Sequence, residues 1–119
     1  MSANYKHFSV EHREGVTIAT LINFELLDRL VTDELQEELV SLVESEKPQM
    51  LIISFAQVRR CSTEVINAML KCRKRTLGYD GKFKLCGMSK DIRGVYRILK
   101  LDGTVFEIHD TVADAWSAF

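Results

Sequence analysis

The side chains best suited to chemistry are six consecutive residues that separate two apolar segments. They carry two guanidinium groups, a thiol, two hydroxyls and a carboxylate, from Arg59, Arg60, Cys61, Ser62, Thr63 and Glu64. Residues 50–53 before them form a short apolar run, which is typical of a strand covered on both faces. From Val65 onward, apolar residues recur at helical spacing. The six residues therefore form a loop between a strand and a helix, where open α/β sheets bind ligands and partners.

The hydroxyls and the thiol of this loop allow different interpretations. Ser62 or Thr63 fits the N-cap of the helix, since both residue types favour that position. If Thr63 is the cap, the Ser62 hydroxyl is left to point outward. Cys61 lies beside Arg60 and the amino end of the helix, an arrangement that lowers the pKa of a thiol. A redox sensor at Cys61 is therefore one hypothesis for this loop.

The residues do not indicate an enzyme. No histidine accompanies a nucleophile, and the chain has neither a glycine-rich phosphate loop nor paired carboxylates in a cleft-forming motif. His7 and His12 lie five residues apart in a strand pattern and so on opposite faces, where we expect solvated histidines rather than a shared metal. We therefore expect no catalytic residue, no metal ligand and no cofactor.

Strand and helix patterns alternate along the chain. Residues 7–13 and 16–22 indicate a hairpin, and Thr32 the cap of a first helix. Residues 23–30 indicate a loop whose apolar side chains either face a partner or, as we expect, pack on the core. The remaining expected elements are a central strand at 50–53, a helix at 63–77, strands at 82–86 and 105–108, and helices capped by Ser89 and by Thr111 with Asp114. Strands separated by helices pair in parallel, with the first strand antiparallel. The sequence thus predicts the α/β class: a four- to five-stranded mixed sheet with about four helices in a single domain, 1–119.

Composition narrows the class of partner. Sixteen basic and seventeen acidic side chains leave a net charge of −1, which provides no overall field to attract nucleic acid or an anionic membrane. No apolar run approaches the ~20 residues of a membrane span, and residues 1–6 lack the apolar centre of a signal peptide, so we expect a cytoplasmic protein. Three cysteines without a Cys-x-x-Cys pair indicate reduced thiols, with Cys72 and Cys86 as small core residues.

A larger pattern connects these segments. The strand, loop and helix of residues 50–78 are followed by a strand that ends near Gly87, a helix that begins near Ile92, and the turn Leu101-Asp102-Gly103. This order resembles the STAS domain of bacterial anti-sigma factor antagonists over nearly the whole chain. The family has Asp-Ser-Ser/Thr-Gly at the start of the central helix, whereas this chain has Cys61 in place of the aspartate and Glu64 in place of the glycine.

The resemblance implies a function for the loop. In that family the first serine is phosphorylated by a partner kinase, and the corresponding residue here is Ser62, with Thr63 as the weaker candidate. The resemblance also implies that the chain is a regulatory module with a protein partner. That partner would be an anti-sigma factor of the serine-kinase type, bound through residues 59–64. Arg59 and Arg60 are then either solvated loop cations or partners of the phosphate. Because Cys61 and Glu64 depart from the family pattern, a scaffold protein of the same fold that is not phosphorylated is an alternative. The sequence does not predict the oligomeric state.

Overall fold

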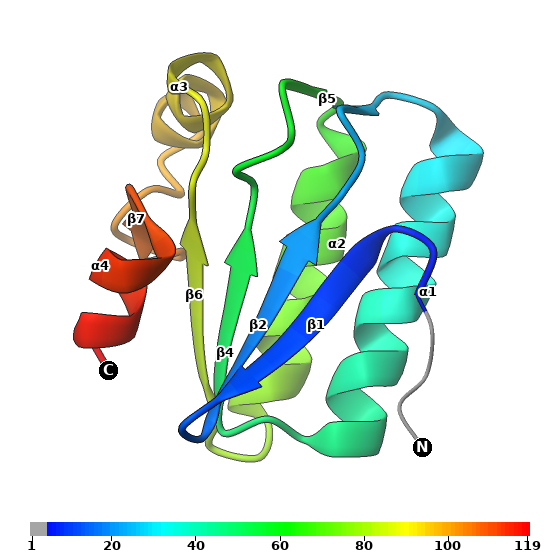
Figure 1. Ribbon diagram of the computed structural model, residues 1–119. Coiled ribbons are helices and arrows are strands. Elements are labelled where there is room, and N and C mark those ends of the chain that lie inside the picture. The colour runs from blue at the N-terminus through cyan, green and yellow to red at the C-terminus, as the bar shows by residue number, and fades with distance from the viewer. Residues whose placement is uncertain (1–4) are drawn as a thin grey trace.

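The computed structural model describes residues 5–119, so the first four residues of the segment considered above for a signal peptide lie outside the described part (Figure 1). Seven strands and four helices are assigned within these residues. In chain order they are β1 (Phe8–Arg13), β2 (Val16–Leu21), β3 (Glu25–Leu26), α1 (Arg29–Glu46), β4 (Met50–Ser54), β5 (Arg60–Cys61), α2 (Glu64–Leu77), β6 (Lys82–Cys86), α3 (Lys90–Ile98), β7 (Ile108–His109) and α4 (Val112–Ser117). The predicted α/β class, with a five-stranded mixed sheet and four helices, is confirmed.

The main sheet has the strand order β1-β2-β4-β6-β7. Strand β1 pairs antiparallel with β2, whereas β2, β4, β6 and β7 pair in parallel, as predicted from the alternation of strands and helices. The carboxyl ends of β2, β4 and β6 therefore meet at one edge of the sheet. Figure 1 shows β5, the amino end of α2 and α3 gathered beyond that edge.

Strand β4 is covered on both faces, as its apolar run predicts. Leu51 and Ile53 belong to the larger core, which also includes apolar residues of α1, α2 and α3. Ile52 points to the other face, into a smaller core that includes Ala115 of α4. All three β4 side chains have no exposed area, and each such burial contributes about 1.5–3 kcal/mol relative to exposure. The central strand is thus a rigid base for the loop that follows it.

Local details of the first helix and of the connections differ from the sequence predictions. The cap of α1 is Asp28, not Thr32, because the Asp28 carboxylate accepts from the Leu30 and Val31 amides and the helix begins one turn earlier. Within the predicted loop 23–30, residues 25–26 pair as β3 with β5. The prediction that this loop packs on the core holds for Leu26, which is buried, and is wrong for Phe24 and Leu27, which are exposed. The last strand lies at residues 108–109, not 105–108. Ser89 and Thr111 cap α3 and α4 as predicted.

His7 is not a solvated histidine. It is buried, and its ring nitrogens lie 3.3 Å from the Asn23 side-chain oxygen and 3.1 Å from a carboxylate oxygen of Glu34. This contact with His7, followed by the charge of Lys6, lowers the pKa of Glu34. His12 is exposed, but its Nε2 lies 2.7 Å from a carboxylate oxygen of Glu46. The strand alternation does not reveal that both histidines contact glutamates of α1.

Candidate functional site

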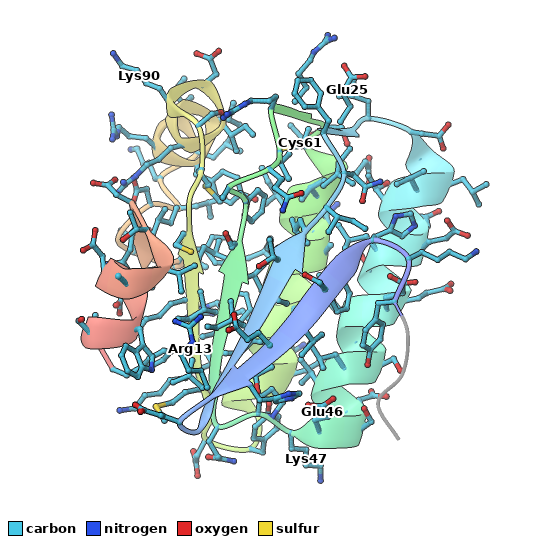
Figure 2. The ribbon with its side chains drawn as sticks, in the orientation of Figure 1. Arg13, Glu25, Glu46, Lys47, Cys61 and Lys90 are labelled. Atoms are coloured by element: carbon cyan, nitrogen blue, oxygen red, sulfur yellow. The ribbon has the colours of Figure 1, made fainter. Side chains whose placement is uncertain are left out.

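The loop between β4 and α2 is held by a two-stranded parallel sheet. Glu25 pairs with Arg60 and Leu26 with Cys61. The Phe24 carbonyl accepts from the Arg59 amide at 2.8 Å, and the Leu26 carbonyl accepts from the Ser62 amide at 2.9 Å. Figure 2 places Glu25 and Cys61 at the same end of the molecule as Lys90 of α3, far from Arg13, Glu46 and Lys47. The backbone of residues 59–62 is therefore fixed by hydrogen bonds rather than left as a free loop.

The two hydroxyl residues occupy different environments. Thr63 is exposed and is the N-cap residue of α2 by position, but its side chain makes no capping hydrogen bond. Ser62 is half-buried, and its Oγ is fully buried without a hydrogen-bond partner. Thr63 is thus the N-cap of α2 by position, as the interpretation with Thr63 as the cap predicted. That interpretation also predicted an outward-pointing Ser62 hydroxyl, and this part is wrong.

Cys61 does not have the lowered pKa that its neighbours in sequence suggest. The side chain is half-buried, and this burial raises the pKa of the Cys61 thiol to about 11, because the thiolate is poorly solvated there. The premise of the redox-sensor hypothesis is therefore wrong at this position. Cys72 and Cys86 are buried core residues, as predicted, and burial raises the pKa of both thiols.

This burial predicts slow chemistry at Cys61. Relative to a solvated thiol with a pKa of 9.0, a pKa of about 11 lowers the thiolate fraction at neutral pH about a hundredfold. Alkylation of the native protein by iodoacetamide at pH 7.5, followed by mass spectrometry of the peptides, is expected to label Cys61 about a hundredfold more slowly than the same cysteine in the urea-unfolded chain. Equal rates in the two states would contradict the assignment of a neutral, poorly solvated thiol.

The charges of the loop are arranged unevenly. Arg60 donates to Glu25 at 2.9 Å in an exposed ion pair, whereas Arg59 forms no ion pair with any residue in the described range 5–119. Glu64 lies in the first turn of α2, and Lys74 and Arg75 lie in its last turn, which matches the helix dipole. Arg59 is therefore an uncompensated cation close to the positive end of α2.

Helix α3 forms the opposite side of the site. Its N-cap Ser89 accepts from the Ile92 amide, and Arg93 donates to Asp102 at 3.0 Å and to Asp110 at 2.9 Å, which ties the helix to the segments around β7. Between β6 and α3, Gly87 adopts a φ of +74°, and a β-carbon there would lie 2.9 Å from the Ala56 amide nitrogen. The position of α3 relative to the end of β4 thus depends on a glycine.

A pocket of about 310 Å³ opens between the loop and α3. Five of the six loop residues, 59–63, line it, and Glu64 does not. Ile66 of α2 and Leu27 close the loop side, and α3 supplies a wall that includes Val95 and Tyr96. The structure thus brings most of the predicted partner-binding residues around one cavity.

The α3 wall was not anticipated as part of the site. The sequence assigns Ile92, Val95, Tyr96 and Leu99 to one apolar stripe, but only Ile92 and Tyr96 are buried, and 40% of Val95 and 50% of Leu99 are exposed. The Tyr96 hydroxyl is fully buried and has no hydrogen-bond partner. A tyrosine in an otherwise aliphatic stripe is the one sequence signal that pointed to a polar requirement there.

In residues 5–119 no helix is long and apolar enough to cross a membrane. The same residues contain no group of three or more His, Cys, Asp or Glu side chains placed to hold a metal ion.

Solved structures of several kinds of protein share this fold. An anti-sigma factor antagonist from Mycobacterium paratuberculosis is 21% identical, with a TM-score of 0.82 over 93% of this chain and 91% of that one. The phosphorylated form of the Bacillus cell fate determinant SpoIIAA is 16% identical, with a TM-score of 0.67 and coverages of 93% and 97%. A sulfate transporter family protein from Wolinella succinogenes is 19% identical, with a TM-score of 0.70 and coverages of 89% and 85%. At these sequence identities, the structural similarity establishes the fold alone.

The sequence comparisons identify the family. No curated protein sequence matches the chain significantly. The model of the STAS domain matches residues 7–115, which is nearly all of the 119 residues. The chain therefore belongs to the STAS domain family.

Proposed function

We propose that this protein is an anti-sigma factor antagonist-like signalling module, rather than an enzyme, and that a partner of the serine-kinase anti-sigma type phosphorylates Ser62. The position of Ser62 carries the proposal: it lies directly before the N-cap of α2, at the carboxyl edge of the parallel strands, where the family has its phosphorylated serine. An anti-sigma factor antagonist and the phosphorylated form of the cell fate determinant SpoIIAA share this fold.

The charges near Ser62 support a phosphate there. The amino end of α2 has no side-chain cap, and Arg59 and Arg60 are within three residues of the serine. A helix N-terminus and guanidinium groups both stabilise phosphate oxygens. Because the Ser62 hydroxyl is buried, phosphorylation requires its side chain to rotate outward, a motion that backbone hydrogen bonds at residues 59–62 do not oppose.

The surface next to the loop suits a protein partner. Apolar side chains beside β3 are unusually exposed, with 62% of Phe24, 46% of Leu27 and 67% of Leu30 accessible. An apolar exposed surface with aromatic residues is characteristic of protein interfaces. We place the partner surface on residues 59–64 and on these three side chains, so that a phosphate on Ser62 lies within the contact area.

A phosphorylation assay tests the proposal. Incubation of the purified protein with ATP and an extract of its native cells is expected to place phosphate on Ser62, because this hydroxyl occupies the family position. Ser62→Ala is expected to remove the phosphate, whereas the matched variant Thr63→Ala retains it, as read by peptide mapping. Phosphate on Thr63 alone would refute the assignment of Ser62.

A second candidate function is a STAS scaffold without phosphorylation. The buried Ser62 hydroxyl and the carboxylate of Glu64 in the first turn of α2 favour it, because both oppose a doubly charged group at this position. In the same assay, an unmodified chain that still binds a partner through its loop would support the scaffold. The raised pKa of Cys61 argues against the redox alternative.

A further inference from the structure

The hydroxyl that the proposed function requires is hidden in the structure. Ser62 Oγ is fully buried, whereas the next residue, Thr63, is exposed. Phosphoryl transfer requires the attacking oxygen to lie in line with the leaving group of the phosphoryl donor, and a buried oxygen does not reach that position. The conformation in the structure therefore protects Ser62, and phosphorylation proceeds from a second conformation.

The backbone around Ser62 is fixed on both sides. The Ser62 amide donates to the Leu26 carbonyl at 2.9 Å, and the Ser62 carbonyl accepts from the Val65 amide at 3.2 Å. These bonds hold the residue between β5 and α2. A change in the exposure of Ser62 Oγ therefore comes from the Ser62 side chain and from the wall next to it, not from unfolding of the loop.

Helix α3 provides that wall through Tyr96. Tyr96 lines the same pocket as Ser62, and it belongs to the core against which Cys61 packs. Burial, followed by the charge of Cys61, raises the pKa of Tyr96, which places the Tyr96 hydroxyl close to the residue before Ser62. In residues 5–119, Tyr96 Oη and Ser62 Oγ are the buried side-chain polar atoms that make no hydrogen bond. Both unpaired hydroxyls thus belong to the contact between β5 and α3.

Opposing contributions act on this contact. Burial of the apolar parts of Ile92 and Tyr96 favours a closed contact. The two unpaired hydroxyls oppose it, because each has lost its hydrogen bonds to water without replacement. The pocket of about 310 Å³ shows that the loop and α3 are not packed against each other throughout, as they would be in a protein core. Opening the contact therefore loses apolar burial but hydrates both hydroxyls.

The attachments of α3 allow such an opening. Arg93 ties the helix to the segments around β7, since it donates to Asp102, to Asp110 and to the Ile108 carbonyl. Within residues 5–119, no hydrogen bond or ion pair joins α3 to residues 59–63. The helix can thus move away from β5 while its ties to the β7 segments persist.

We propose that α3 gates Ser62. In the closed conformation, Tyr96 packs beside β5 and the Ser62 hydroxyl is buried. In the open conformation, α3 lies further from β5 and both hydroxyls reach water. The kinase acts on the open conformation, so the population of that conformation sets the rate of phosphorylation. This regulation rests on the proposed phosphorylation of Ser62, whereas the opening itself does not.

A thiol at position 62 measures the opening without a kinase. Ser62→Cys and Thr63→Cys would each be made in a Cys61→Ala chain and alkylated with iodoacetamide at pH 7.5, with the same thiol in the urea-unfolded chain as the reference. The gate predicts that the thiol at position 62 reacts at least about tenfold more slowly than its reference, as expected for an open conformation populated to about 10% or less. The thiol at position 63 is expected to react at nearly its reference rate. Equal protection of the two thiols would overturn the gate.

A matched pair of tyrosines tests the role of α3. Tyr96→Phe removes the unpaired hydroxyl and so favours the closed conformation. It is expected to slow alkylation at position 62 about a further tenfold, while the midpoint of thermal unfolding stays the same or rises. Tyr79→Phe removes a hydroxyl that donates to the Pro48 carbonyl at 2.9 Å, and is expected to lower the midpoint without changing that alkylation rate. An unchanged rate in Tyr96→Phe, or equal changes in both variants, would overturn the role of Tyr96.

Phosphorylation assays of the same variants separate the gate from the proposed function. With ATP and the native cell extract, Tyr96→Phe is expected to slow phosphorylation of Ser62 by the same factor as it slows alkylation at position 62. If the thiol at position 62 is protected but wild type receives no phosphate on Ser62, the proposed function and its regulation are refuted and the opening stands. Equal phosphorylation rates of wild type and Tyr96→Phe would overturn control of the kinase by the gate.

Discussion

Ser62→Asp is expected to lower the affinity for the kinase-type partner at least about a hundredfold. The aspartate places a permanent charge beside the exposed apolar side chains of Phe24, Leu27 and Leu30, and burying that charge against a partner costs about 3 kcal/mol or more. With the side chain turned outward from the buried position of the Ser62 hydroxyl, the folded chain tolerates the charge, because an anion at the amino end of α2 is favoured by about 0.3–1 kcal/mol. Isothermal titration with the anti-sigma factor of the same organism measures the affinity, and urea unfolding measures the stability.

Two controls separate charge from shape. Ser62→Asn has nearly the size of the aspartate without its charge, and is expected to retain affinity within about tenfold of wild type. Thr63→Asp places the same charge on the neighbouring exposed residue, at the same end of α2. If Ser62→Asn weakens binding as strongly as Ser62→Asp, steric fit rather than charge controls the contact, and the switch model fails.

Gly87→Ala is expected to lower the free energy of unfolding by about 2–4 kcal/mol. A residue with a side chain is strained at a φ of +74°, and the added β-carbon would lie 2.9 Å from a backbone nitrogen of Ala56, which cannot move aside as a flexible side chain does. Because Gly87 joins β6 to the segment that leads into α3, the pocket wall should shift as well. Urea unfolding followed by circular dichroism measures the loss.

Gly103→Ala is the matched control for this variant. Gly103 has a similar φ of +81°, but a β-carbon there meets nothing within 4 Å. The control therefore carries only the conformational cost, about 1–2 kcal/mol. Equal losses in the two variants would show that the close approach to Ala56 contributes nothing, and that α3 does not depend on it.

The parts of the fold that the sequence predicts are those with a repeating pattern. The apolar run of β4, the stripe of α2 and the caps at Ser89 and Thr111 each leave a local signal, and each is confirmed. Strands β3 and β5 were missed because each has two residues and pairs with a segment 35 positions away, as Glu25 does with Arg60. No periodicity can develop over two residues, so tertiary contact alone creates them.

The sequence predicts where the candidate site lies, but not how its side chains are buried and hydrogen-bonded. The hydroxyls of residues 62–63 at a helix N-terminus are visible in the sequence, whereas the burial of Ser62 Oγ depends on segments distant in the chain. The same holds for Cys61, where the nearby arginine suggests a lowered pKa and desolvation by the fold raises it instead. At Tyr96, helical spacing indicates that the residue lies on the apolar side of α3, but not whether its hydroxyl has a hydrogen-bond partner.

The modification state of Ser62 in the living cell is the measurement that tests the proposed function most directly. The protein would be isolated from its native cells under several growth and stress conditions, its intact mass determined, and the peptides across residues 58–71 mapped. The antagonist switch predicts a phosphate on Ser62 in at least one condition and an unmodified thiol at Cys61. A chain that carries no phosphate on Ser62 under any condition, although it still binds its partner, would contradict the switch and identify the protein as a scaffold.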